Sequence, residues 1–130
     1  YFKVNIIFSD FKEYLWVTKV IIVFSGLSFL FFGISCLFSN FMVIEFKRYD
    51  LEKFRIIVGL LQLLGSVGLF IGLFSKNWAM LASLGLAILM AFGFMVRIKI
   101  KDPFILAFPS LFYALLNMIL FIILIRFENK

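Results

Sequence analysis

Histidine is absent from this chain, and cysteine and proline are scarce. Without histidine there is no histidine-ligated haem, no histidine zinc site and no histidine general base. The single cysteine, Cys36, excludes an internal disulfide and a CxxC redox pair. The sequence also contains no Ser-His-Asp set, P-loop, dinucleotide fingerprint or cluster of metal ligands. These absences exclude the enzyme classes that depend on such residues.

Long apolar stretches, by contrast, fill almost all of the 130 residues. They cover residues 16–38, 54–74, 78–96 and 104–125. Each is about 19 to 23 residues long, which is enough to cross about 30 Å of hydrocarbon as a helix. Hydrophobic residues make up 65% of the chain, whereas soluble domains average roughly half. We therefore expect an all-α integral membrane protein that forms a single membrane domain over residues 1–130.

Local signals give the expected helix boundaries. We predict membrane helices over residues 10–38, 51–74, 77–97 and 103–126, and a short amphipathic helix in the interfacial segment over residues 41–53. Asp10 with Glu13 three residues later forms a capping box, and Asn77 and Asp102-Pro103 are the expected starts of later helices. Because the connections are short, neighbouring helices should be antiparallel, which predicts an up-down-up-down four-helix bundle.

The interfacial segment over residues 41–53 is the most polar part of the chain. Its polar residues Glu45, Arg48, Tyr49 and Glu52 fall on one face of a short helix. Such a helix either rests on the membrane surface or forms a lid over the bundle. The pattern alone leaves both interpretations open.

The net charge of +6 bears on two questions: what the protein contacts, and which way it is oriented in the membrane. The charges lie in loops and at helix ends, where anionic lipid headgroups are the expected partner and nucleic acid is not. The Lys and Arg residues are almost evenly divided between the two predicted sides of the membrane. The positive-inside rule therefore gives only a lean towards cytoplasmic termini.

Small and polar residues form a stripe along each predicted membrane helix. The stripes contain Ser25, Gly26, Ser28 and Gly33; then Arg55, Gly59, Gln62, Gly65, Ser66, Gly68 and Gly72; then Ala79, Ser83, Met90, Gly93 and Arg97; and finally Ser110, Ala114 and Asn117. Small residues let membrane helices approach closely, and polar residues hydrogen-bond across the interface. Bundle packing is the simpler interpretation, and a ligand pocket is the alternative.

Charged residues converge at one predicted end of the bundle. Arg55 starts one helix and Arg97 ends the next, so an antiparallel pair brings both to the same side. The candidate ligand-binding residues are Glu45, Arg48, Arg55, Gln62, Arg97 and Asp102 at this end, with Asn117 on the last helix. These side chains either solvate and anchor the helix ends or frame a polar mouth. We expect no catalytic residue and no metal site among them, and the absence of a carboxylate in mid-membrane disfavours a proton relay.

Three segments carry a family resemblance. FGISCL over residues 32–37, followed by EFKRY over residues 45–49, resembles the first loop of DoxX-like small membrane proteins, particularly those of Bacteroidetes-type bacteria. FRIIVGLLQLLGSVGL over residues 54–69 is similar to the second helix of that family, with Gln62 where many members carry Glu. RIKIKD over residues 97–102, followed by Pro109, is similar to the third loop and fourth helix.

The resemblance spans about residues 20–124 and implies a four-helix bundle in a bacterial inner membrane. DoxX-like proteins have been linked to a thiosulfate:quinone oxidoreductase subunit and to membrane thiol-stress complexes, and distant eukaryotic relatives to assembly or trafficking. The first hypothesis is therefore a non-catalytic accessory or assembly subunit that contacts lipids and other membrane subunits and has no cofactor of its own. The second is a component of a quinone- or sulfur-compound-linked oxidoreductase, with a quinone or bound lipid at the Arg55/Gln62/Arg97 end. The third is a small-metabolite transporter.

Overall fold

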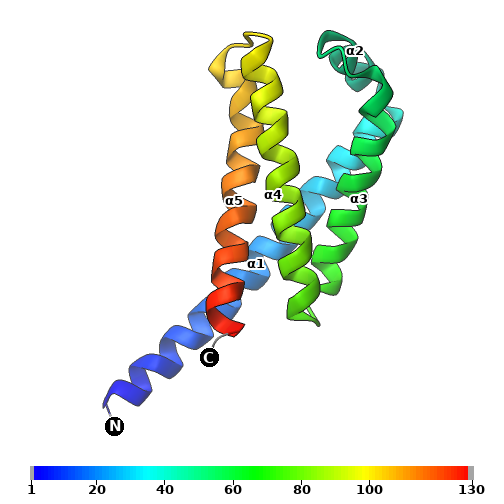
Figure 1. Cartoon of the computed structure of the whole chain (residues 1–130). Helices are drawn as coiled ribbons and strands as arrows, with labels where there is room; N and C mark the ends of the chain where they lie inside the picture. Colours follow the sequence, from blue (N-terminus) through cyan, green and yellow to red (C-terminus); the bar gives the residue numbers. More distant parts are fainter. Residues whose placement is uncertain (1, 129–130) are drawn as a thin grey trace.

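The computed structural model describes the backbone of residues 2–128 and the side chains of residues 16–126. In chain order the elements are α1 (Phe2–Phe38), α2 (Asn40–Arg48), the short 3-10 helix η1 (Glu52–Phe54), α3 (Arg55–Ile71), α4 (Lys76–Lys99) and α5 (Phe104–Glu128) (Figure 1). The described backbone contains helices and short turns and no strand, so the prediction of an all-α protein is confirmed.

Four of these helices are long and apolar enough to cross a membrane. The spans are Trp16–Phe38, Glu52–Ile71, Lys76–Lys99 and Phe104–Arg126. Large hydrophobic side chains cover their outer surface; Leu64 is 68% exposed and Ile105 is 78% exposed. An outer surface with so many exposed apolar side chains fits contact with lipid. Helices also suit the hydrocarbon, because they satisfy their backbone hydrogen bonds internally. The prediction of four membrane helices is confirmed.

The start of α1 differs from the prediction. The helix begins at Phe2, so the predicted start at Asp10 is wrong. Residues 2–9 contain neither glycine nor proline, and nothing in them stops a helix that is already formed. The capping-box pattern of Asp10 and Glu13 is therefore compatible with a helix start but does not force the helix to begin there. The expected cap Asn77 also lies inside its helix, since Ser75 is the residue that precedes α4 with extended backbone angles.

The end of α1 at Phe38 agrees with the prediction, and the other boundaries differ from it by one to five residues. The predicted segments 41–53, 51–74, 77–97 and 103–126 correspond to Asn40–Arg48, Arg55–Ile71, Lys76–Lys99 and Phe104–Glu128. The largest difference is at the end of α2, where Asp50 takes a left-handed conformation with φ 60° and ends the helix. Pro103 precedes α5 instead of opening it, and its carbonyl accepts the Ala107 N–H at 3.3 Å.

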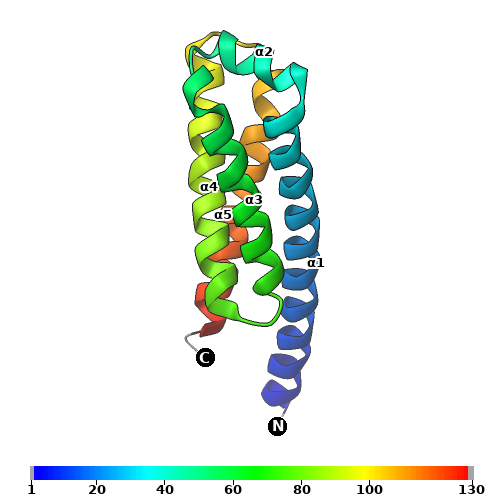
Figure 2. The same cartoon turned by 90° about the vertical axis from the view of Figure 1, so that its right-hand side faces the viewer.

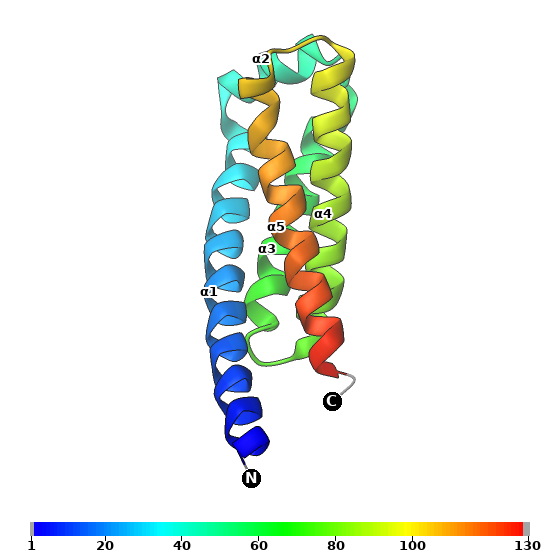
Figure 3. The same cartoon turned by 90° about the vertical axis from the view of Figure 1, so that its left-hand side faces the viewer.

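The bundle consists of two closely packed helix pairs. α1 packs mainly against α3 and α4 mainly against α5, while contacts of α3 with α4 and of α1 with α5 join the pairs. Figures 2 and 3 show that α2 lies across one end of the long helices, together with the α4–α5 turn, and that the chain termini lie at the other end. We call the first of these the α2 end.

Glycines permit the close approach of α1 and α3. A Cβ at Gly33 would lie 2.7 Å from Leu63 Cγ, and one at Gly59 would lie 3.0 Å from Cys36 Cβ. Both glycines belong to the stripes of small residues, so this part of the stripes serves helix packing.

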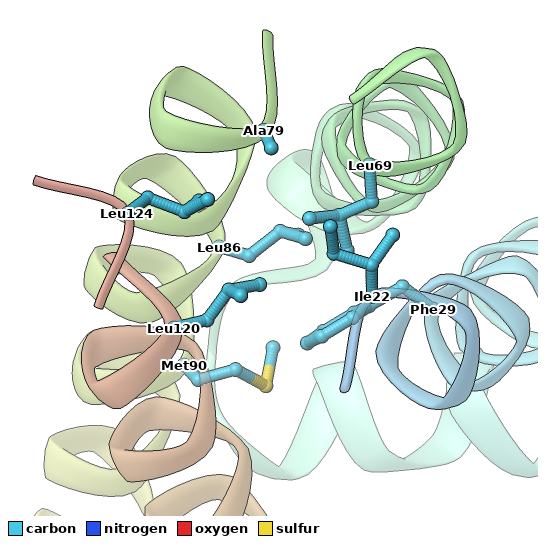
Figure 4. Close-up of a cluster of buried hydrophobic side chains, with 8 residues drawn as sticks. All are labelled: Ile22, Phe29, Leu69, Ala79, Leu86, Met90, Leu120 and Leu124. Atoms are coloured by element: carbon cyan, nitrogen blue, oxygen red, sulfur yellow. The ribbon is translucent and has the colours of Figure 1, made fainter. Parts of the chain in front are cut away.

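The apolar core lies between the four long helices. It consists of Ile22, Phe29, Leu69, Ala79, Leu86, Met90, Leu120 and Leu124, which point towards one another in Figure 4. Polar contacts cross the same interior: Ser25 Oγ lies 3.1 Å from Asn117 Oδ1, and Ser66 Oγ donates to the Gly26 carbonyl at 2.6 Å. Buried polar groups need such partners, particularly in a membrane.

Candidate functional site

Four charged residues form an ion cluster at the α2 end. Glu45 and Arg48 come from α2, Arg97 from the last turn of α4, and Asp102 from the α4–α5 turn. Arg48 lies 2.9 Å from a Glu45 oxygen and 2.8 Å from an Asp102 oxygen. Arg97 Nη1 lies 3.0 Å from Asp102 Oδ2 and 3.4 Å from Glu45 Oε2. Charges of opposite sign thus alternate around the cluster and tie α2 to the end of α4.

The local backbone at the end of α4 positions Asp102. Lys101 is left-handed with φ 63°, and its N–H donates to the Ile98 carbonyl at 3.0 Å. The Asp102 N–H donates to the Arg97 carbonyl at 3.0 Å. This pair of bonds is a Schellman motif, which folds the chain back over the last helical turn. Asp102 is therefore held beside the helix end that carries Arg97.

The ion cluster keeps its carboxyl groups charged, as expected for ion pairs that hold α2 in place. Hydrogen bonds from Arg48 are the main cause that lowers the pKa of Glu45 and of Asp102, against the opposing effect of burial. Burial raises the pKa of Tyr49 to about 12, and its hydroxyl donates to Glu45 Oε2 at 3.3 Å. Both carboxylates and the phenol thus keep their usual charge state near neutral pH.

Low pH should weaken the ion cluster and release α2. A carboxyl group whose pKa is lowered in the folded state contributes stability above its ordinary pKa and loses it as the pH falls through the lowered value. For Glu45 and Asp102, with ordinary values of 4.5 and 3.8, we expect α2 to stay docked from about pH 8 to pH 5 and to loosen below about pH 4. A nitroxide on Lys47→Cys, in a Cys36→Ser background, would report this as increased mobility.

The matched control for the acid experiment is the double variant Glu45→Gln/Asp102→Asn. Its α2 should be mobile at every pH, because the carboxylates that titrate are gone. A mobility change centred between about pH 6 and 7 in the parent would contradict the assignment to these two carboxylates.

A chamber lies directly beneath the ion cluster. Two adjoining cavities of about 400 Å³ and about 180 Å³ form it. Both are lined by Cys36, Met42, Gln62, Met90, Arg97 and Ser110. Met42 belongs to α2, so this helix covers the chamber as a lid, which is one of the two interpretations that the sequence left open. The walls are mostly apolar, with a few polar groups.

Gln62 is the most informative polar group of the chamber. It is only 5% exposed, and its Oε1 accepts the Cys36 thiol at 3.7 Å. Among the described residues, its Nε2 has no acceptor, although no fully buried side-chain nitrogen or oxygen there lacks a partner. The amide nitrogen therefore faces the open space of the chamber. An amide with one end bonded and the other end directed into a cavity is a donor in position for a ligand.

Arg97 provides a second donor. Its side chain lines both cavities and is 18% exposed. Within the described part of the chain all of its ion pairs and hydrogen bonds use Nη1, so Nε and Nη2 have no acceptor there. The guanidinium also lies 5.3 Å from the centre of the Tyr49 ring, which orients it by a cation–π contact.

Arg55 is placed apart from the chamber. Its Nη1 donates to the carbonyls of Cys36 at 2.6 Å and Leu37 at 3.1 Å. The last carbonyls of a helix have no partner within the helix, and a charged donor from a neighbour satisfies them. Arg55 therefore caps α1 and does not line the chamber with Gln62 and Arg97.

Asn117 lies deeper, among the core side chains. It is fully buried between the Ser25 hydroxyl at 3.1 Å and the Tyr113 carbonyl at 2.9 Å. Its bonding therefore serves the contact of α1 with α5. Tyr113, one turn earlier, lines the chamber and donates to Ser28 Oγ at 2.9 Å.

Sequence reasoning missed Tyr113 and the contact of Cys36 with Gln62. The helical period gave a signal for the first, because Tyr113 stands three residues after Ser110 and four before Asn117 on the same stripe. Nothing in the sequence pairs Cys36 with Gln62, since they lie on different helices.

The polar groups of the chamber are mainly hydrogen-bond donors. The described residues contain no group of three or more Cys, Asp or Glu side chains able to hold a metal ion. The charges of the ion cluster cancel, so Gln62 and Arg97 present hydrogen-bond donors without a net charge. Such a chamber suits a largely apolar molecule that carries an oxygen acceptor.

The fold and the chamber define the class of protein: a multi-pass integral membrane protein, a helical bundle with a mostly apolar chamber at one end that contains a few polar groups. A family model described as the DoxX-like family matches residues 20–119, which is most of the chain. The protein therefore belongs to the DoxX-like family, as the resemblance predicted. No curated protein and no solved structure matches it.

Proposed function

We propose that this protein binds a small, largely apolar ligand in the chamber, with an oxygen of the ligand accepting hydrogen bonds from Gln62 and Arg97. The observation that carries the proposal is the buried Gln62 amide, whose nitrogen faces a cavity of about 400 Å³. This volume lies in the range of small-molecule sites. Ring carbonyls of quinones and oxygens of sulfur compounds are acceptors of the required kind.

The residues of the chamber support a binding role within a larger assembly. Cys36 is the only thiol among the lining residues, and one thiol without a partner cysteine completes no dithiol cycle. We therefore propose that the electrons come from another subunit. We propose an accessory subunit of a quinone- or sulfur-compound-linked oxidoreductase in the bacterial inner membrane. Its termini are proposed to be cytoplasmic, which assigns the chamber to the outer half of that membrane.

Transport of a small metabolite, the third hypothesis, has less support. The core side chains Phe29, Leu69 and Leu86 are at most 2% exposed and pack in one cluster with Met90, which also lines the chamber (Figure 4). A solute that entered the chamber would meet this core.

Replacing Gln62 with leucine tests the proposed function. The variant keeps the size of the side chain and removes the amide donor, so we expect the affinity for a decyl-substituted benzoquinone to fall about tenfold or more. Binding would be measured by calorimetry on protein in lipid nanodiscs. Within the protein, leucine removes only the weak hydrogen bond from the Cys36 thiol, so the unfolding temperature should change little.

Ser66→Ala is the matched control, because Ser66 lies one turn further along α3 and bonds to the Gly26 carbonyl outside the chamber. Its quinone affinity should equal that of the parent. Equal affinity of the parent and Gln62→Leu would refute the proposed site.

A further inference from the structure

We infer that the ligand enters the chamber sideways from the bilayer, through a portal between α1 and α5, and that it is an amphiphile whose apolar tail stays in the lipid. The inference rests on the proposed function, because it uses the same chamber. It adds the route of entry and the chemical class of the ligand: a head that accepts hydrogen bonds, joined to a chain that partitions into hydrocarbon.

The chamber reaches the lipid-facing surface at this portal. Its larger cavity is lined by Phe31 of α1 and Phe41 of α2, which are 67% and 65% exposed, and by the exposed Pro109 of α5. The same cavity reaches inward to Gln62, which is 5% exposed. One continuous space thus joins the outer apolar surface to the buried amide.

The contacts between α1 and α5 end where the portal begins. The hydrogen bonds between these helices join Ser25 to Asn117 and Ser28 to Tyr113, and the ring contacts of α1 with α5 also converge on Tyr113. Nearer the α2 end, the facing positions are the small residues Ser35 and Ser110, which line the cavity. Hydrogen-bonded and aromatic side chains thus join α1 to α5 in the middle of the bundle, whereas nearer the α2 end Ser35 and Ser110 leave space beside the exposed Phe31 and Pro109.

The lid α2 covers the route from water. α2 lies across the bundle end (Figure 2), and the ion cluster ties it to the α4–α5 turn through Arg48–Asp102 at 2.8 Å and Arg97–Glu45 at 3.4 Å. Phe46 and Tyr49, in and just after α2, line the smaller cavity. A ligand from the aqueous side would have to break this cluster, whereas one from the bilayer meets phenylalanine and serine side chains.

The geometry also orients the ligand. The donors Gln62 and Arg97 lie at the inner end of the chamber, and the exposed rings of Phe31 and Phe41 lie at the portal. The head must therefore point inward and the tail outward, where the hydrophobic effect keeps it among the lipid chains.

The test uses two probes and one pair of matched variants. The probes are 2,3-dimethoxy-5-methyl-1,4-benzoquinone and its 6-decyl derivative, which share a head and differ in the tail. Ser35→Phe adds bulk at the portal, and Ile34→Phe adds an aromatic ring on the lipid-facing side of the same helix, where Ile34 is 46% exposed. Binding is measured in nanodiscs of one lipid composition, so that partition of the decyl probe is the same for all proteins.

We expect Ser35→Phe to weaken binding of the decyl probe by about tenfold or more, and to change binding of the tail-less probe by less than about threefold. Ile34→Phe should leave both unchanged. Retained binding of the tail-less probe shows that Ser35→Phe is folded.

Equal losses for both probes in Ser35→Phe would overturn the portal, because position 35 would then belong to the head site. Unchanged binding of both probes would overturn it as well. In either case a loss of binding in Gln62→Leu would leave the proposed function standing. If the parent binds neither probe, the proposed function and the inference both fail for this class of ligand.

Discussion

Replacing Arg97 with leucine should release α2 and lower the unfolding temperature by about 5 °C or more. The Glu45 and Asp102 side chains are 10% and 6% exposed, and both lie within ion-pair distance of Arg97. Without it, two nearly buried carboxylates share the single cation Arg48. Removal of one partner from a buried ion pair destabilises more than the pair itself stabilises, because it leaves an uncompensated charge.

Thermal unfolding in detergent and the mobility of a nitroxide at Lys47→Cys would measure this effect. Arg126→Leu is the control, since Arg126 is an exposed arginine near the end of α5, at the opposite end of the bundle (Figure 1). It should change the unfolding temperature by no more than about 1 °C. Adding Glu45→Gln to Arg97→Leu should restore part of the stability by removing the surplus carboxylate. Identical behaviour of Arg97→Leu and Arg126→Leu would show that the cluster does not hold the lid.

The expected instability of Arg97 variants makes them poor tests of ligand binding. Arg97 is one of the candidate ligand-binding residues, but it also forms ion pairs with Glu45 and Asp102 in the ion cluster. Loss of activity in an Arg97 variant would therefore mix two causes. Gln62→Leu separates them, because Gln62 contributes only one weak bond to the protein.

Gly72→Ala should be the most damaging single-methyl change in the bundle. An added Cβ would lie 2.7 Å from Ala79 Cα and 2.8 Å from Ala79 N, and closer still to Ala79 Cβ. These atoms belong to the backbone of α4, so rotation of a side chain does not relieve the contact. The α3–α4 turn would have to open, and we expect a loss of about 2 kcal/mol or more in unfolding free energy.

Gly85→Ala is the matched control for Gly72→Ala. Apart from its chain neighbours and the backbone of its own helix, no atom lies within 4 Å of the position that its Cβ would take. Alanine favours helix by about 1 kcal/mol over glycine, so this variant should be as stable as the parent or slightly more stable. Reversible unfolding in mixed micelles gives both values. A Gly72→Ala protein as stable as Gly85→Ala would show that the turn can adapt.

The fold was largely predictable because membrane helices are defined by local sequence. About 20 apolar residues suffice to define a span, and the four spans need no knowledge of distant contacts. The helix ends were less predictable, as α1 shows. The residues that extend this helix to Phe2 contain no helix-breaking residue. Asp10 therefore lies inside the helix and not at its start.

The candidate site was predictable only in part, for a similar reason. Placing Arg97 and Asp102 at the same end as α2 required only the antiparallel order of the helices. The separation of Arg55 from Gln62 required the side-chain directions, because Arg55 reaches back to the carbonyls of α1 while Gln62 points inward. The Asp50 and Lys101 turns, in which a residue other than glycine takes a positive φ, carry no clear sequence signal.

The pairing of α1 with α3 and of α4 with α5 has a consequence for how the chain reaches its membrane. Each pair is made from segments that are neighbours in the sequence, so most of its contacts form between residues synthesised one after the other. The first hairpin can pack before the second leaves the ribosome, and the contacts of Gly33 and Gly59 between α1 and α3 need no help from α4 or α5. The second hairpin then docks through Tyr113 and Asn117, and the ion cluster closes last, since it joins residues 45 and 48 to residues 97 and 102. In this order of assembly the chamber is complete only in the fully inserted protein.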